Sequence, residues 1–80
     1  MSDQMTIYST QWCGYCHRLM KQLDREGVAY DVVDIEQDPG AADYVMKVNG
    51  GNQTVPTVVF ADGSALTNPS LAQVTQRLAV

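Results

Sequence analysis

The 80-residue chain is predicted to be an α/β protein, with one small four-stranded mixed sheet and helices on both of its faces. Three observations favour this class. Short β-branched segments alternate with segments of helical period along the chain. A helix separates the first two predicted strands, which favours a parallel pair with a right-handed crossover. The last two predicted strands are separated by Asp62-Gly63, a typical hairpin signal.

The first strand and helix occupy the N-terminal third of the chain. Met5–Ser9 (MTIYS) is short, β-branched and aromatic, and is expected to be a strand. A helical period then runs from about Cys13 to Glu26. Gly27 stands where a left-handed residue commonly ends a helix, so the helix is predicted to stop there. Its apolar stripe comprises Cys16, Leu19, Met20 and Leu23.

The middle of the chain contains a second strand and a second helix. The strand is expected within AYDVVDIE, around Val32 and Val33. Asp38 followed by Pro39 is typical of a helix start, because the Asp side chain caps the helix and proline suits its first position. This helix is predicted to be short and to end at residues 49–52, Asn-Gly-Gly-Asn.

The C-terminal third is predicted to hold a hairpin and a last helix. The third strand lies in VPTVVF and starts at Pro56, because proline cannot donate to the middle of a ladder. A short fourth strand is expected near Ala65 and Leu66. Asn68-Pro69 or Ser70 would then cap the helix. The apolar stripe of that helix comprises Leu71, Val74 and Leu78. The predicted order is β-α-β-α-β-β-α, with residues 1–80 in a single domain.

Composition and charge exclude several classes of function. The net charge is −4, from nine acidic and five basic residues, and no Lys/Arg cluster is present, so nucleic acid is not an expected partner. No apolar run is long enough to span a bilayer, so no membrane is expected either. The N-terminus, MSDQMTIYST, lacks a basic region and an apolar region. We therefore expect mature sequence without a signal peptide, a cytoplasmic location and a monomer.

The stretch CGYCH, residues 13–17, is compatible with three chemistries: c-type haem attachment, half of a zinc site, or a redox-active dithiol. Haem attachment normally requires export, and the alternation of strands and helices does not favour a cytochrome. A structural zinc site takes four ligands, whereas this chain has two cysteines and one histidine. A metal shared between two chains stays open. His17 is then interpreted as a half-exposed helix residue.

The dithiol interpretation rests on where the two cysteines fall. Cys13 is at the predicted helix N-terminus and Cys16 is one turn in, so their Cα atoms should be about 5 Å apart, within disulfide range. The free N–H groups of the first turn and the helix dipole favour a thiolate at Cys13. Cys16 lies on the apolar stripe and should be more buried and less ionised. We therefore predict that Cys13 attacks and Cys16 resolves.

The residues around the cysteines suggest a substrate groove. Trp12 and Tyr15 flank the nucleophile, in a loop and an exposed first turn, and are expected to frame this groove. Gln11 carries no charge, so the helix end must supply most of the acidification of Cys13. Arg18 and Lys21 are interpreted mainly as solvated residues.

These motifs resemble those of a known family. WCGYC after a strand, TVPT before another strand and the βαβαββα order resemble glutaredoxins and the wider thioredoxin fold, over essentially the whole chain. The stretches VNGGNQTVPTVVFADGS, LTNPS and VDIE look most like mycoredoxins, the glutaredoxin-like proteins of bacteria that use mycothiol. The resemblance implies a thiol-disulfide oxidoreductase. Cys13 would attack a protein–mycothiol mixed disulfide, and a second mycothiol would regenerate it.

The resemblance also implies the partners and further site residues. Mycothiol would be a co-substrate, linked indirectly to NADPH through a reductase, with no bound cofactor. The clients would be mycothiolated or disulfide-containing proteins. Pro56 would be cis, and the Val55 backbone would pair with the extended substrate. Thr54, Thr67 and Asn68 complete the implied substrate-binding set.

One stretch departs from the glutathione-using members, which carry Gly-Gly, a small residue and Asp after the last strand. Here Thr67, Asn68, Pro69 and Ser70 occupy that region. Their hydroxyl and amide groups suit a sugar-bearing thiol, and they equally suit a helix cap.

Two alternative functions remain open. One is a dithiol electron donor, for example to ribonucleotide reductase, recharged by thioredoxin reductase and dependent on both cysteines. The segments WCGYC and LTNPS weigh against it. The other is an iron-sulfur carrier in which two chains share a cluster through Cys13.

Overall fold

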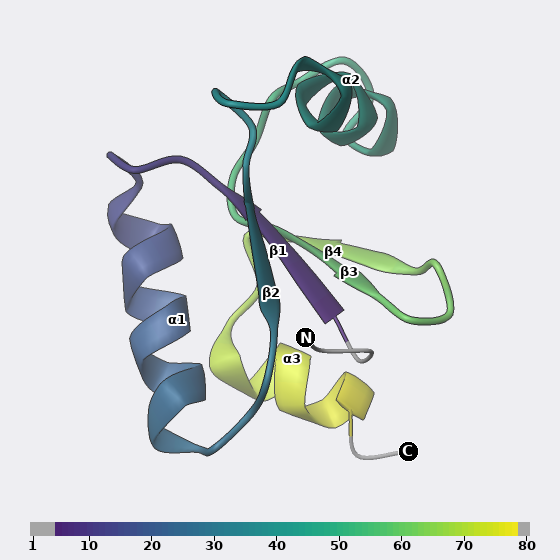
Figure 1. Cartoon of the computed structure of the whole chain (residues 1–80). Helices are drawn as coiled ribbons and strands as arrows, with labels where there is room; N and C mark the ends of the chain where they lie inside the picture. Colours follow the sequence, from purple (N-terminus) through teal and green to yellow (C-terminus); the bar gives the residue numbers. More distant parts are fainter. Residues whose placement is uncertain (1–4, 79–80) are drawn as a thin grey trace.

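The computed structural model describes residues 5–78, which form a four-stranded sheet flanked by helices on both sides (Figure 1). The elements are β1 (Met5–Ser9), α1 (Gly14–Arg25), β2 (Asp31–Asp34), α2 (Pro39–Val48), β3 (Thr57–Phe60), β4 (Ala65–Thr67) and α3 (Leu71–Leu78). The strand order is β2-β1-β3-β4, with β1 parallel to β2 and antiparallel to β3, and β3 antiparallel to β4. The predicted fold class and element order are confirmed.

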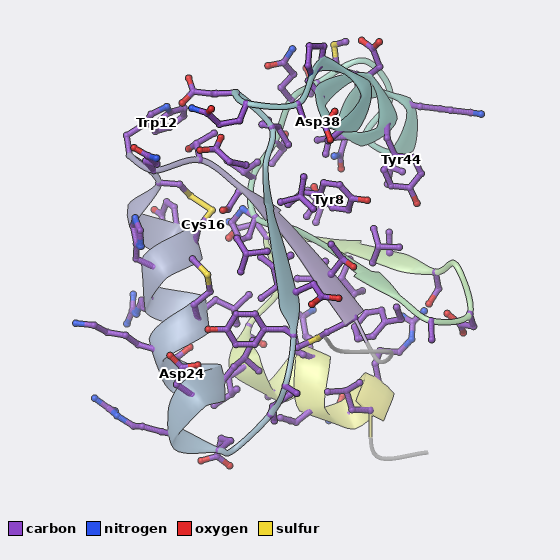
Figure 2. The ribbon with its side chains drawn as sticks, in the orientation of Figure 1. Tyr8, Trp12, Cys16, Asp24, Asp38 and Tyr44 are labelled. Carbon is purple, nitrogen blue, oxygen red and sulfur yellow. A yellow bond between two sulfur atoms is a disulfide. The ribbon has the colours of Figure 1, made fainter. Side chains whose placement is uncertain are left out.

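The sheet divides the interior into two apolar clusters, because successive side chains of a strand point to opposite faces. Helices α1 and α3 cover one face, and the buried cluster there comprises Met5, Ile7, Leu19, Leu23, Val58, Phe60 and Val74. Helix α2 covers the other face with a smaller cluster of Ile35, Ala41 and Val45. On that face the rings of Tyr8 and Tyr44 pack with their centroids 5.5 Å apart (Figure 2).

The helix ends follow the local signals in the sequence. Cys13 and Glu26 cap α1 at its two ends, and Gly27 has φ of +70°. Asp38 caps α2, where its Oδ1 accepts the Ala41 backbone N–H at 3.2 Å and Pro39 is the first helical residue. Of the predicted apolar stripe of α1, Cys16, Leu19 and Leu23 are buried, and Met20 is partly buried against the core.

Two strand boundaries differ from the predictions, and the structure decides one choice that the sequence left open. Strand β2 is shorter than the apolar run suggested, because it lies at the sheet edge, where Val32 is 49% exposed. Strand β3 begins at Thr57, one residue after the predicted start at Pro56. Of the two candidate caps of α3, the structure selects Ser70: its Oγ accepts the Gln73 N–H at 3.2 Å, and Gln73 Oε1 accepts the Ser70 N–H at 2.8 Å. This reciprocal pair is a capping box.

Within residues 5–78, no helix is both long enough and apolar enough to cross a membrane.

Candidate active site

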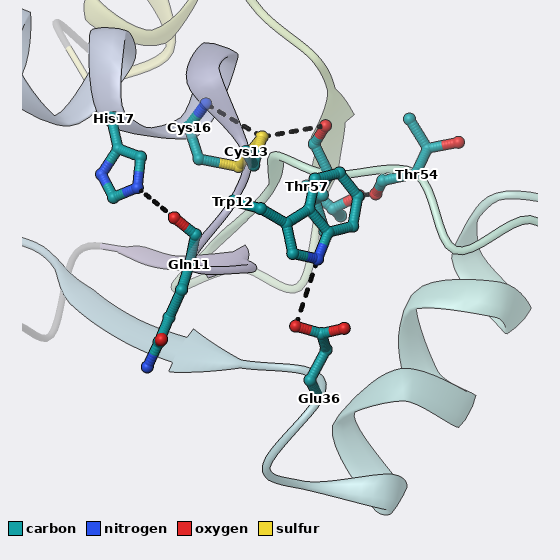
Figure 3. The surroundings of a disulfide bond; sticks show 9 residues. Gln11, Trp12, Cys13, Cys16, His17, Glu36, Thr54 and Thr57 are labelled. Carbon is teal, nitrogen blue, oxygen red and sulfur yellow. Dashed lines mark hydrogen bonds between the residues drawn. A yellow bond between two sulfur atoms is a disulfide. The ribbon is translucent and has the colours of Figure 1, made fainter.

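The two cysteines form a disulfide at the N-terminus of α1, with their Cα atoms 5.3 Å apart (Figure 3). Cys13 is 4% exposed and Cys16 is fully buried, so the predicted order of burial is confirmed, although the difference is small. The Cys16 backbone N–H donates to Cys13 Sγ at 3.1 Å. An N–H group aimed at a sulfur stabilises negative charge on it, so Cys13 is the better placed thiolate once the disulfide opens.

The loop before β3 lies against the same sulfur. The Val55–Pro56 peptide bond is cis, as the resemblance implied, and Cys13 Sγ lies 3.7 Å from the Val55 carbonyl oxygen. In the disulfide, Cys13 Sγ carries no proton, so this contact is not a hydrogen bond. In the reduced protein the thiol S–H can donate to that carbonyl. The Val55 backbone is thus beside the nucleophile, where the predicted pairing with a substrate strand requires it.

Two side-chain bonds hold the loop that carries Trp12. The Trp12 indole Nε1–H donates to Glu36 Oε1, on the loop between β2 and α2, at 3.2 Å (Figure 3). His17 Nε2 lies 2.7 Å from the Gln11 carbonyl oxygen, and a carbonyl only accepts, so Nε2 carries the proton. His17 is exposed rather than half-exposed, and its ring stays beside the loop through this bond. Neither hydrogen bond could be predicted from the sequence.

A groove of about 390 Å³ runs between α1 and the start of α3. It is lined by Tyr15, Arg18, Leu19, Gln22, Asn68, Pro69, Ser70, Leu71 and Gln73. Tyr15 and Asn68, which belong to different parts of the predicted site, therefore line one groove. Trp12 does not line it and stands instead with Glu36 on the loop between β2 and α2. The described lining residues include one cation and several neutral hydrogen-bonding groups, and none of them is acidic.

A polar network that the sequence did not reveal supports the loop before β3. Asn49 Nδ2 donates to the Val45 carbonyl at 2.9 Å and to Thr57 Oγ1 at 3.0 Å. Thr57 Oγ1 donates in turn to the Thr54 carbonyl at 2.7 Å. The Thr67 hydroxyl donates to Asn49 Oδ1, so its proton already has a partner. Thr54 and Thr67 thus hold the loop in place, and their predicted contacts with substrate stay predictions.

Asn68 connects this loop to the groove. Its backbone N–H donates to the Pro56 carbonyl at 2.8 Å, and its φ of +45° is left-handed. Asparagine tolerates this conformation better than most residues. The structure therefore places Val55 beside Cys13 and joins Asn68 to Pro56, and the contacts of these residues with substrate stay predictions. Among residues 5–78, no group of three or more His, Cys, Asp or Glu side chains could hold a metal ion.

A cysteine pair at a helix N-terminus, beside a cis-proline loop on a four-stranded sheet with helices on both faces, defines a thiol-disulfide oxidoreductase of thioredoxin-like fold. The glutaredoxin family model matches residues 5–65, and the chain belongs to the glutaredoxin family. It is 60% identical over 74 residues to a Mycobacterium tuberculosis H37Rv protein named as a glutaredoxin, covering 92% of this chain and 88% of that protein. It is 47% identical over 76 residues to mycoredoxin 1 of Corynebacterium glutamicum ATCC 13032, covering 95% and 94%.

Solved structures share the fold at lower identity. The glutaredoxin grx-1 of Archaeoglobus fulgidus superposes with a TM-score of 0.79 at 23% identity, covering 96% of this chain and 87% of that one. Methanoredoxin of Methanosarcina acetivorans superposes with a TM-score of 0.78 at 21% identity, covering 95% and 84%. At this identity the likeness concerns the fold alone.

Proposed function

We propose that the chain reduces protein–mycothiol mixed disulfides through the Cys13 thiolate and is regenerated by mycothiol. The observation that carries this proposal is the environment of Cys13 Sγ, which accepts the Cys16 N–H and lies beside the Val55 carbonyl. A thiolate held at a helix N-terminus is a nucleophile, and the adjacent backbone of Val55 can pair with an extended substrate.

The proposed reaction has two exchanges. The Cys13 thiolate attacks the mycothiol sulfur of the mixed disulfide, the substrate S–S bond breaks, and the client leaves as a thiolate. A second mycothiol thiolate then attacks the mycothiol sulfur held on Cys13. This step releases the Cys13 thiolate and forms oxidised mycothiol, which an NADPH-dependent reductase returns to the thiol. Mycothiol is thus a co-substrate, and Cys16 is dispensable on this route.

Two observations support mycothiol as the thiol. The relative with 47% identity is a mycoredoxin. The groove between α1 and α3 presents the neutral polar side chains of Gln22, Asn68 and Gln73, with Arg18 as its one cation among the described lining residues. A hydroxyl-rich, uncharged sugar thiol can hydrogen-bond to such groups, whereas a thiol with two carboxylates would call for more positive charge.

A second candidate is the dithiol electron donor recharged by thioredoxin reductase. The Cys13–Cys16 disulfide favours it, because the two sulfurs can close within one chain and store two electrons. This route makes both cysteines essential.

Recharging of the oxidised protein distinguishes the two candidates. One arm supplies mycothiol with its NADPH-linked reductase, and the other supplies NADPH with thioredoxin reductase at equal protein concentration. The proposal expects faster reduction in the mycothiol arm. Faster reduction in the thioredoxin reductase arm would replace it with the dithiol donor.

A further inference from the structure

The hydrogen bond between Trp12 and Glu36 joins two loops that are 24 residues apart in the sequence. The donor, Trp12 Nε1–H, comes from the loop directly before Cys13, and the acceptor, Glu36 Oε1, from the loop between β2 and α2 (Figure 3). The acceptor is itself on a fixed turn, because the Glu36 backbone N–H donates to Asp34 Oδ1 at 2.9 Å. The hydrogen bond therefore anchors the indole to the loop between β2 and α2.

Trp12 is 72% exposed, so this hydrogen bond holds a side chain that lies mostly in solvent. An exposed side chain without a partner samples several rotamers, and ordering it on binding lowers affinity. A bond to a carboxylate is charge-assisted and selects one orientation of the ring. A rigid aromatic ring offers a large contact area at a low entropic cost. A folded substrate can cover such a ring, whereas a small disulfide presents little surface to it.

We propose that Glu36 is a positioning residue for protein substrates: it fixes the Trp12 ring beside Cys13 as a preformed contact surface for the polypeptide that carries the disulfide. This inference rests on the oxidoreductase activity of the family and is independent of mycothiol. In the reaction used to test it, the reduced chain attacks a substrate disulfide through Cys13, and the Cys16 thiolate then attacks the Cys13 sulfur. The Cys13–Cys16 disulfide forms and the substrate leaves as two thiols, so two electrons are transferred.

The test compares two disulfides of different size, with no low-molecular-weight thiol present. Reduced protein is mixed with insulin or with hydroxyethyl disulfide, and its oxidation is followed by acid quenching and alkylation of the remaining thiols. For Glu36→Ala, the ratio of the insulin rate constant to the hydroxyethyl disulfide rate constant should fall about three- to tenfold, the loss expected for one unfixed side chain. Glu36→Gln keeps an oxygen acceptor and should retain most of the ratio. Asp43→Ala removes an exposed carboxylate of α2 and serves as the charge control.

Fluorescence provides a readout that a merely structural role would not change. Trp12 is the one tryptophan in the sequence, so time-resolved anisotropy reports on its ring alone. Glu36→Ala should increase the amplitude of fast ring motion, and Glu36→Gln should not. Trp12→Phe keeps a ring without the donor, so its effect on the rate ratio should not add to that of Glu36→Ala. Three outcomes would overturn the proposal. These are an unchanged ratio in Glu36→Ala, equal losses for Glu36→Gln and Glu36→Ala, or additive losses in the double variant that combines Trp12→Phe with Glu36→Ala.

Discussion

The backbone N–H of Cys16 and the carbonyl of Val55 meet at one atom, Cys13 Sγ, at 3.1 Å and 3.7 Å. The two groups act in opposite directions on the reduced thiol. The N–H favours the thiolate, and the carbonyl favours the protonated form, which can donate to it. The N–H is closer and lies at a helix N-terminus, where the helix dipole adds positive potential. Its effect should therefore dominate.

Titration of the reduced protein tests this balance. We expect the pKa of the Cys13 thiol to lie below that of a free cysteine. The measurement follows ultraviolet thiolate absorbance against pH in Cys16→Ser, which leaves Cys13 as the one thiol and keeps the backbone N–H of residue 16. A value at or above that of a free thiol would mean that the Val55 carbonyl dominates.

The two cysteines should differ in their importance for mycothiol-dependent turnover. Cys13→Ser removes the attacking sulfur and should abolish reduction of a mycothiolated protein. Cys16→Ser should retain turnover, because each exchange of the proposed route passes through Cys13. NADPH consumption in the coupled assay measures both variants. Complete loss of activity in Cys16→Ser would exclude the monothiol route.

Gln22 tests the role of the groove. This half-buried side chain lines the groove and lies on α1, C-terminal to Cys16. Gln22→Ala should raise the KM for mycothiol about two- to tenfold, which corresponds to the loss of one hydrogen bond. Gln76, on the exposed side of α3 and outside this groove, provides the matched control. If both variants behave like the wild type, mycothiol binds elsewhere.

Two buried threonines should respond oppositely to the same substitution. Thr10 is 3% exposed and, among the described residues, its Oγ1 is a buried side-chain atom without a hydrogen-bond partner. Removing an unsatisfied buried hydroxyl is favourable, so Thr10→Val should stabilise the oxidised protein by about 1 kcal/mol. Urea unfolding of the wild type and the variant measures this difference.

Thr57→Val is the matched comparison. The Thr57 hydroxyl is fully buried, donates to the Thr54 carbonyl and accepts from Asn49. Its loss should lower the free energy of unfolding by about 1–3 kcal/mol. A destabilised Thr10→Val would indicate that the Thr10 hydroxyl finds a partner in solution.

Tyr30 should make stability sensitive to alkaline pH. Burial, followed by a hydrogen bond to Asp24 at 2.8 Å, raises the pKa of Tyr30 from 10.0 to about 12. The folded state therefore holds the phenol proton more tightly than the unfolded state. The resulting stability is fully present below pH 10 and is lost as the pH rises toward about 12.

The variant Tyr30→Phe tests this linkage. It should be less stable than the wild type at neutral pH, by about 1 kcal/mol for the lost hydrogen bond. The difference should shrink as the pH rises above 10, because only the wild type loses the contribution. Urea unfolding across this range measures it, with Tyr15→Phe as the exposed control. A constant difference would show that the Tyr30 phenol is not linked to stability.

Much of the fold could be predicted because its signals are local. Asp38-Pro39 starts a helix through atoms within one turn, and Gly27 ends another through its own backbone. The spacing of Cys13 and Cys16 likewise follows from helix geometry and gives the observed Cα separation of 5.3 Å. The cis bond before Pro56 was predicted from the family resemblance and not from any local rule.

The remaining features of the site join residues that are distant in the sequence. Asn49 reaches Thr57 and Thr67 across two loops, and nothing in its own segment, VNGGN, indicates these partners. The sheet order also makes β2 an edge strand. For this reason β2 is shorter than predicted, and Val32 is exposed.

The sequence by itself determined the α/β class, the element order, the position of Cys13 at a helix start and the greater burial of Cys16. Each of these depends on side-chain period, capping chemistry or helix geometry within a few residues. Only the tertiary structure decided that Val55 lies beside the sulfur, that Glu36 holds Trp12 and that Tyr15 and Asn68 share a groove. These contacts depend on how the sheet and helices pack, since packing brings together loops separated by 24 to 42 residues or more.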